Sequence, residues 1–349
     1  MTRPARQRLN AEIAIGVLVS LASLGGVLWW ALRQEAPQLP SDAGGRYLVC
    51  AALAVYAAVT LARGLRWHLI LQHATIEHQP IDALGITTVG YMGNTVLPAR
   101  GGEVLRILVM AARSGARRRE VLGTIVPERL LDAAALALLF AAVTLFGVQD
   151  TALGTFAALT AAVVTVAAIS ALFVYKRLRL AGRFERFAAR VRPVAGGSRL
   201  LVTRSGGMLL LLTCGVWVAE GLSLSLCAAA LDISLSWPEA FATVVLASFF
   251  SLIPAAPGFV GTFDAAAVIG LNAASVTGSA ALSILLLYRF VLFVPITIVG
   301  LALLLTRYGG LTMLRSAVRT TEAARVGDDP GVEILEDLVS PAKGAPHGM

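Results

Sequence analysis

Two segments of the chain place charged residues inside otherwise apolar sequence. Residues 94–103 read Asn-Thr-Val-Leu-Pro-Ala-Arg-Gly-Gly-Glu, and a later apolar run carries Glu128, Arg129 and Asp132 near its start. Ionisable side chains within membrane segments are rare and mark binding sites or pathways. Arginines and free helix N-termini bind phosphate through charge and N–H donors. The chemistry that these residues predict is binding of an anion, with carboxylates that orient the arginines.

The first segment predicts a broken helix with a positively charged tip. Pro98 ends one helix, the chain turns through Gly101 and Gly102, and a second helix starts near Glu103. The unpaired N–H groups of that second helix give the tip a partial positive charge, to which Arg100 adds a full one. The tip is therefore a candidate phosphate site. The alternative is that Glu103 caps the helix and pairs with Arg100, which only stabilises the bend.

A second, weaker break lies at residues 251–261. Its prolines and glycines supply the bend, and Asp264 takes the position that Glu103 has in the first segment. The second tip has no arginine, so we expect the stronger anion site at the first. The predicted tip residues are Asn94, Pro98, Gly101 and Gly102 in the first segment, and Pro254, Pro257, Gly258, Gly261 and Asp264 in the second.

Two further groups of charges have both functional and structural interpretations. Glu128 and Asp132 are four residues apart and share one helical face. They either face a partner such as Arg100 or lie at the interface with their charges in water. Arg289 is the one charge in its apolar span, where an uncompensated arginine costs about 3 kcal/mol at the membrane centre. It must face a cavity, a lipid phosphate or a carboxylate, for which Glu220 and Asp264 are the candidates.

Composition indicates a polytopic membrane protein. Hydrophobic residues make up 57% of the chain and charged residues 14%, and the mean hydropathy is +0.77. The net charge of +8 comes from arginines between apolar runs, which orient a membrane protein and do not indicate nucleic-acid binding. The three cysteines lie in apolar runs and imply no disulfide framework. No cofactor or metal motif is recognisable, and the first apolar run is expected to be retained.

Apolar run lengths and arginine positions predict the topology. A crossing helix needs about 20 apolar residues, and two long regions, 81–113 and 239–272, are broken near the middle. Basic segments should be cytoplasmic, which makes both broken regions re-entrant hairpins that enter from opposite faces. Segments 63–80 and 176–206 are predicted to be surface helices. The predicted full spans are roughly 11–32, 46–64, 121–147, 152–175, 208–231 and 280–305.

The resulting architecture is an all-α polytopic membrane protein with about six full transmembrane helices and two oppositely oriented re-entrant hairpins. Three spans and one hairpin in each half produce an inverted repeat, as in many transporters. We expect a membrane domain over residues 1–310, with halves at about 10–147 and 152–307. Residues 311–349 are expected to form a disordered cytoplasmic tail. The protein is expected in the cytoplasmic membrane with both termini inside.

Several ordered motifs resemble the transmembrane region of lysylphosphatidylglycerol synthases, also described as flippase-like domain proteins. The resemblance covers about residues 10–307 and implies a region that moves or binds lipids. The soluble aminoacyl-transfer domain of fused synthases has no counterpart here, so we do not expect synthase activity. The matching motifs are Arg63 to Trp67, Asn94…Pro98-x-Arg100-x-Gly102-Glu103 with Arg106, Glu128-Arg129-x-x-Asp132, and Pro254-x-x-Pro257-Gly258…Gly261. At the second break the family often has Pro-Gly-Gly-x-Gly followed by Glu, from which this chain departs.

Together these observations predict a lipid translocase or carrier for an anionic phospholipid or a polyprenyl phosphate. The lipid phosphate is expected to meet Arg100, Arg129 and Arg289. The carboxylates Glu103, Glu128, Asp132 and Asp264 are expected to orient these arginines.

Two other functions remain open at this point. One is a membrane-embedded glycosyltransferase that uses a polyprenyl-phosphate donor, which would need a metal-binding acidic pair at a membrane face. The adjacent pair Asp328–Asp329 lies in the predicted tail. The other is a non-catalytic partner of an enzyme in lipid or hopanoid biosynthesis.

Overall fold

The computed structural model describes residues 29, 31–97, 100–146, 203–251, 257–310 and 312. Within this part of the chain every regular element is a helix. The predicted spans 11–32 and 152–175, the surface helix 176–206 and the tail 311–349 lie almost entirely outside the described residues. Pro98 and Pro254 also lie outside them. The all-helical class is confirmed.

Three helices are long and apolar enough to cross a membrane: α2 (Ala43–His73), α8 (Arg204–Ala229) and α11 (Gly278–Arg307). A fourth, α5 (Arg118–Phe146), has 29 residues but carries more charge. These helices have 26 to 31 residues, more than the ~20 that a crossing requires. They contain the predicted spans 46–64 and 280–305 and cover nearly all of 121–147 and 208–231.

Helix α2 begins at a side-chain cap and runs much further than the sequence predicts. Asp42 accepts hydrogen bonds from the N–H groups of Gly44 and Gly45 at 3.1 and 2.8 Å. These hydrogen bonds hold the pKa of Asp42 below its usual range, and the bond from Gly45 has the largest effect. The helix continues to His73, so the predicted surface helix at 63–80 is wrong. Arg63 and Arg66 can continue it because they find carboxylate partners inside the protein.

Both broken regions form two helices with a break between them, as predicted. In the first, α3 (Pro80–Val96) packs against α4 (Gly101–Ser114). In the second, α9 (Trp237–Phe250) packs against α10 (Thr262–Ala273), and a short 3-10 helix, η2 (Pro257–Phe259), lies in the connection. We call these pairs the first and second hairpins.

The turn of the first hairpin differs from the prediction. Gly101 and Gly102 are the first residues of α4, and the left-handed backbone conformation falls on Arg100, with φ of +57°. The glycines allow the two arms to approach closely. A Cβ on Gly93 would lie 2.6 Å from the Cα of Gly102. The N–H of Gly102 donates to the side-chain oxygen of Asn94 at 3.0 Å, so the two arms are also joined by a hydrogen bond.

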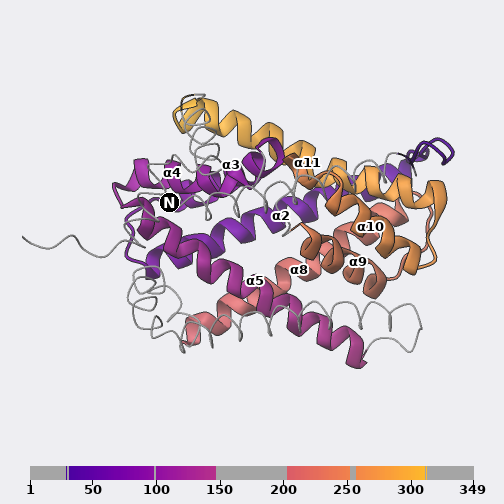
Figure 1. The fold of residues 1–349 in the computed structure, drawn as a ribbon, viewed down its shortest axis with the longest axis horizontal. Helices are drawn as coiled ribbons and strands as arrows, with labels where there is room; N and C mark the ends of the chain where they lie inside the picture. The colour runs from indigo at the N-terminus through magenta and orange to yellow at the C-terminus, as the bar shows by residue number, and fades with distance from the viewer. Residues whose placement is uncertain are drawn as a thin grey trace, which may run out of the picture.

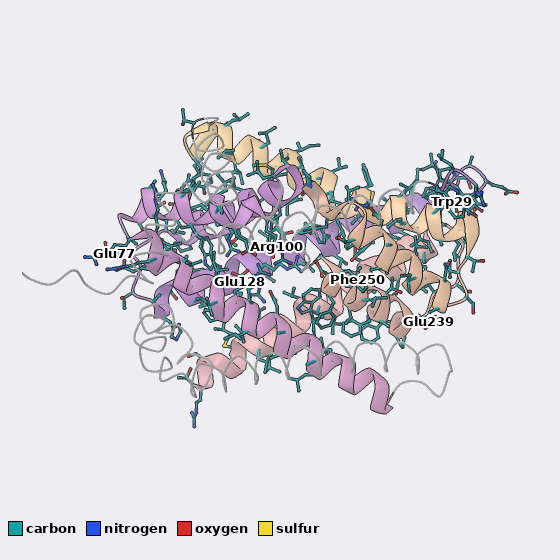
Figure 2. All side chains as sticks on the ribbon, in the orientation of Figure 1. Trp29, Glu77, Arg100, Glu128, Glu239 and Phe250 are labelled. Carbon is teal, nitrogen blue, oxygen red and sulfur yellow. The ribbon has the colours of Figure 1, made fainter. Side chains whose placement is uncertain are left out.

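The two hairpins lie at opposite ends of the molecule, and their tips meet near its middle (Figure 1). Figure 2 shows Arg100 between Glu77 at one end and Glu239 at the other. The turn in η2 packs against α3, where a Cβ on Gly258 would lie 3.6 Å from the carbonyl oxygen of Thr95. Helices α2 and α8 pack against each other and run along the length of the molecule (Figure 1).

The first hairpin is bonded to the C-terminal end of α11 (Arg307 and the following Tyr308). Asp82, near the start of α3, accepts hydrogen bonds from Arg307 at 3.0 Å and from Tyr308 at 3.2 Å. Arg113, in the last turn of α4, lies 3.2 Å from the same carboxylate. Helix α11 also packs closely against α3 at Gly300, where a Cβ would lie 2.5 Å from the Cβ of Met92. The first hairpin and α11 therefore form a closely packed unit.

Candidate functional site

A cavity of about 270 Å³ lies where the two hairpin tips meet. Its wall contains both charged and aromatic residues. The charged residues in its wall are Arg63, Arg100, Glu103, Arg129, Asp132 and Glu220, and the aromatic residues include Phe249, Phe259, Phe263 and Phe293. This volume is close to the lower limit for small-molecule sites, which begin at about 300 Å³. The cavity therefore suits a headgroup and not a whole lipid.

Arg100 joins the two tips. Its Nη2 donates to the carbonyl oxygen of Ser251 at 3.0 Å, at the end of α9. Its guanidinium carbon lies 5.7 Å from the ring centroid of Phe259. The nearest carboxylate is that of Glu103, at 3.5 Å. Arg100 is thus weakly paired, and its Nε atom is buried without a hydrogen-bond partner.

Arg129 contacts three carboxylates at the edge of the cavity. It lies 3.4 Å from Glu103, 3.4 Å from Glu128 and 3.2 Å from Asp132. Its side chain is 35% exposed, the largest exposed fraction in this cluster. Of the residues predicted from sequence, the structure therefore brings together five: Arg100, Glu103, Glu128, Arg129 and Asp132.

A buried network of ion pairs lies next to the Arg129 edge of the cavity, on the side away from the cavity. Arg106 of α4 donates to both carboxylate oxygens of Glu128, at 3.1 and 2.7 Å. Arg66 of α2 lies 3.4 Å from Glu128 and donates to Asp132 at 2.6 Å. It also donates to Thr213 of α8 at 3.1 Å. Glu128 faces this network and is absent from the cavity wall, so it holds α2, α4 and α5 together.

Arg63 and Glu220 form a second ion pair that the sequence interpretation missed. Arg63 Nη2 donates to Glu220 Oε1 at 2.7 Å, and both side chains are 8% exposed. Sequence reasoning considered Glu220 only as a partner of Arg289. One signal in the sequence was available. Arg63 and Arg66 are three residues apart and therefore lie on the same face of any helix that contains both.

Arg289 holds the second tip and is absent from the cavity wall. Its Nε donates to the carboxylate of Asp264, and its Nη2 donates to the carbonyl oxygen of Gly258 at 3.4 Å. The guanidinium carbon lies 5.1 Å from the ring centroid of Phe293 and 5.5 Å from that of Phe263. Both rings line the cavity, so Arg289 lies behind this part of its wall.

The two tips share one structural feature, a carboxylate in the first turn of the second arm that pairs with an arginine. Glu103 is the third residue of α4, and Asp264 is the third residue of α10. Each carboxylate pairs with an arginine on the helix that follows its hairpin: Arg129 on α5 and Arg289 on α11. Asp264 also accepts a hydrogen bond from the N–H of Gly261 at 2.9 Å, which caps α10.

The charges around the cavity favour an anion. In the described part of the chain, the connected ion pairs join four arginines, Arg66, Arg100, Arg106 and Arg129, with three carboxylates, Glu103, Glu128 and Asp132. Arg63 and Glu220 form a separate, balanced pair in the same cavity wall. Buried charges are stable only when they are paired. The excess positive charge is therefore available to a bound anion. No group of three or more His, Cys, Asp or Glu residues in the described ranges is arranged to hold a metal ion.

Comparison with protein families finds a match to the lysylphosphatidylglycerol synthase TM region over residues 13–300. The match covers far more than half of the chain. The chain belongs to this family. Membership in the lysylphosphatidylglycerol synthase TM region family, together with the three long apolar helices, identifies a multi-pass membrane protein.

Two curated proteins show more limited similarity to this family member. A UPF0104 membrane protein of Pyrococcus horikoshii is 28% identical over 123 residues, which make up 34% of this chain and 35% of that protein. The phosphatidylglycerol lysyltransferase of Staphylococcus aureus is 33% identical over 89 residues, 25% of this chain and 11% of that protein. The chain thus spans well under two thirds of the length of these relatives.

Proposed function

We propose that this protein is a flippase-like membrane protein that binds the phosphate of an anionic or polyprenyl-linked lipid in the cavity and moves that lipid across the membrane. The observation that carries the proposal is an ion-pair network with one more arginine than carboxylate beside a cavity at the meeting point of the tips. Arg100 is the weakly paired arginine there, and Arg129 is the most exposed. Both have donors that a phosphate can use.

The aromatic residues in the cavity wall support a lipid ligand. Phe249, Phe259, Phe263 and Phe293 share the wall of the cavity with its arginines, and the cavity is too small for a lipid chain. Such an arrangement suits a molecule with a phosphate at one end and apolar groups next to it. The name of one relative, phosphatidylglycerol lysyltransferase, refers to a phospholipid and agrees with this ligand class.

In this proposal both hairpins are re-entrant. The arms of the hairpins have 12 to 17 residues, and at ~1.5 Å per residue the longest arm reaches past the middle of a ~30 Å hydrocarbon core. The broken backbone at each tip is tolerated because it is buried in protein or lines the cavity. With spans at 11–32 and 152–175, the chain would have six full transmembrane helices.

The proposed fold is an inverted repeat. In this scheme α2 corresponds to α8, the first hairpin to the second, and α5 to α11. The support comes from the carboxylate–arginine pair that both tips have, because Glu103–Arg129 and Asp264–Arg289 occupy equivalent positions. Opposed hairpins at the two ends of the molecule fit the same scheme (Figure 1). In transporters built this way, one repeat rocks against the other around a central site.

We place the basic end of the molecule, with both termini, in the cytoplasm. The arginines at the end of α4, the start of α5, the start of α8 and the end of α11 support this orientation. The protein would then lie in the cytoplasmic membrane. Its partners would be membrane lipids and, in one form of the proposal, an enzyme of lipid biosynthesis that supplies the lipid.

A translocation assay in liposomes tests the function. Purified protein is reconstituted with fluorescent phosphatidylglycerol, and the labels that move to the outer leaflet are quenched from outside. We expect movement with the wild type and its loss in Arg100→Ala. Arg46→Ala, which removes an exposed arginine outside the cluster, is the matched control and should retain it. Wild-type protein that moves no lipid, or equal rates in the two variants, would contradict the proposal.

A further inference from the structure

Among the carboxylates in and near the cavity wall, Glu220 has the fewest cationic partners. In the described part of the chain Glu128 lies within 4 Å of three arginines, and Asp132 and Glu103 each lie within that distance of two. Glu220 has Arg63 alone, and its side chain is 8% exposed. An unpaired carboxylate at that depth is costly in a membrane protein. The charge of Glu220 therefore depends on one guanidinium.

The other groups around Glu220 do not replace that partner. Asp132 on α5 repels it, and Tyr56 on α2 and Tyr288 on α11 are neutral. Arg66 on α2 is also attractive but is bound to Asp132 and Glu128. The residues that α9 and the following Ser251 contribute to the cavity wall are Val244, Ser248, Phe249 and Ser251, none of which is charged.

Arg63 is also one of the three arginines that a phosphate in the cavity can reach. Its ion pair with Glu220 uses only Nη2, so other donors of the guanidinium remain for a ligand. The Tyr91 and Trp217 rings, with centroids 5.1 and 5.6 Å from its guanidinium carbon, keep Arg63 at the cavity wall. A phosphate bound there would share one cation with Glu220.

When two anions lie next to one cation, their mutual repulsion favours protonation of the weaker acid. A phosphodiester is a far stronger acid than a carboxylic acid. We propose that Glu220 is a proton-binding site, and that binding of a lipid phosphodiester in the cavity is accompanied by uptake of one proton from water by its carboxylate. The proton adds to a carboxylate oxygen, and no other bond forms or breaks. This inference rests on the proposed function.

The proposal predicts how lipid affinity depends on pH. Because the complex holds one proton more than the free protein and free lipid, affinity rises as the pH falls, by about tenfold per pH unit where Glu220 is ionised in the free protein. In a cell, the same linkage would make lipid loading more favourable on the acidic side of the membrane. The direction of movement would then depend on the proton gradient.

The test measures binding of short-chain phosphatidylglycerol to the full-length protein in phosphatidylcholine nanodiscs between pH 6 and 8. This lipid keeps one negative charge throughout, so the ligand does not titrate. Dimethyl phosphate, a phosphodiester without chains, is tested in parallel to separate lipid recognition from recognition of a free anion. Calorimetry in buffers of different ionisation enthalpy reports the number of protons taken up.

For the wild type we expect uptake of about one proton per lipid and an affinity that rises toward low pH. Glu220→Gln should bind at all pH values with no proton uptake. Glu120→Gln removes an exposed carboxylate and should behave as the wild type. If Glu220→Gln is unstable because Arg63 loses its partner, the neutral double variant Arg63→Gln/Glu220→Gln replaces it. It should bind the lipid more weakly, because one of the three arginines in the wall is removed, and without proton uptake.

Each outcome is decisive. Lipid binding by the wild type without proton uptake, or uptake that persists in Glu220→Gln, overturns this inference and leaves the proposed function standing. Binding of dimethyl phosphate as tight as that of the lipid shows that the site recognises a free anion, which overturns the lipid assignment. Absence of binding to either probe overturns the proposed function and this inference with it.

Discussion

At the first hairpin the arginine belongs to the tip itself and faces the cavity, whereas at the second it comes from α11 and is bound to the carboxylate of the tip. Arg100 has its nearest carboxylate at 3.5 Å and hydrogen-bonds to the opposite hairpin. Arg289 is paired with Asp264 and holds the η2 turn through Gly258. The two tips thus use their arginines in different ways. We expect the first tip to recognise the ligand and the second to shape the cavity.

The largest effect should come from breaking the anchor of the first hairpin. Arg106 is almost fully buried and binds both oxygens of Glu128. Removing one partner of such a pair leaves a buried unpaired charge, which costs about 3–5 kcal/mol. Arg106→Ala should therefore lower the free energy of unfolding, measured in detergent micelles by chemical denaturation. Arg118→Ala, at an exposed position, should have little effect; equal effects of the two would contradict the anchoring role.

Arg289 is expected to stabilise the second tip and not to bind the ligand. Arg289→Ala leaves Asp264 without its cation and should destabilise the protein, by less than Arg106→Ala because Arg289 is 18% exposed. The neutral pair Asp264→Asn/Arg289→Gln should recover stability and lipid movement. A double variant that is stable but moves no lipid would show that Arg289 binds the phosphate directly, as the sequence alone suggested.

A smaller effect is expected from the close packing of the first hairpin. A side chain on Gly102 would clash with α3, where its Cβ would lie 2.5 Å from the backbone nitrogen of Asn94. Gly102→Ala should cost about 1–3 kcal/mol of stability, as overpacking does elsewhere. Gly207→Ala has no neighbour within 4 Å and should be neutral or slightly stabilising, because alanine favours a helix. Thermal unfolding of the two variants side by side measures the difference.

The smallest effect should come from the junction of the first hairpin with α11. Arg113→Ala removes one of the groups that face Asp82, but Arg307 and Tyr308 remain bound to that carboxylate. Because Arg113 is 42% exposed, the loss should be no more than about 1 kcal/mol. Asp82→Asn should cost more, since it weakens all three contacts at once. The order of the two unfolding midpoints checks this.

The sequence predicted the breaks and the local charges better than the contacts between distant segments. Pro and Gly within apolar runs locate both hairpins, and helical spacing indicates that Glu128 and Asp132 share a face. The pairing of Arg63 with Glu220 depends on α2 packing against α8, which no local pattern reveals. Residue spacing also does not show which residue forms the turn. Glycine suits both a left-handed turn and close packing, so the sequence alone does not reveal that Arg100 forms the turn and Gly102 allows the close packing.

The central claim is that the tips of both hairpins meet inside the bilayer. The most direct test places a nitroxide at Val96, the last residue of α3, which is 46% exposed, in a cysteine-free variant. Accessibility to oxygen and to a water-soluble nickel chelate then reports its depth in liposomes. The account predicts a position near the bilayer centre, about 15 Å from either edge of the hydrocarbon core. A depth at the level of the lipid headgroups would contradict it.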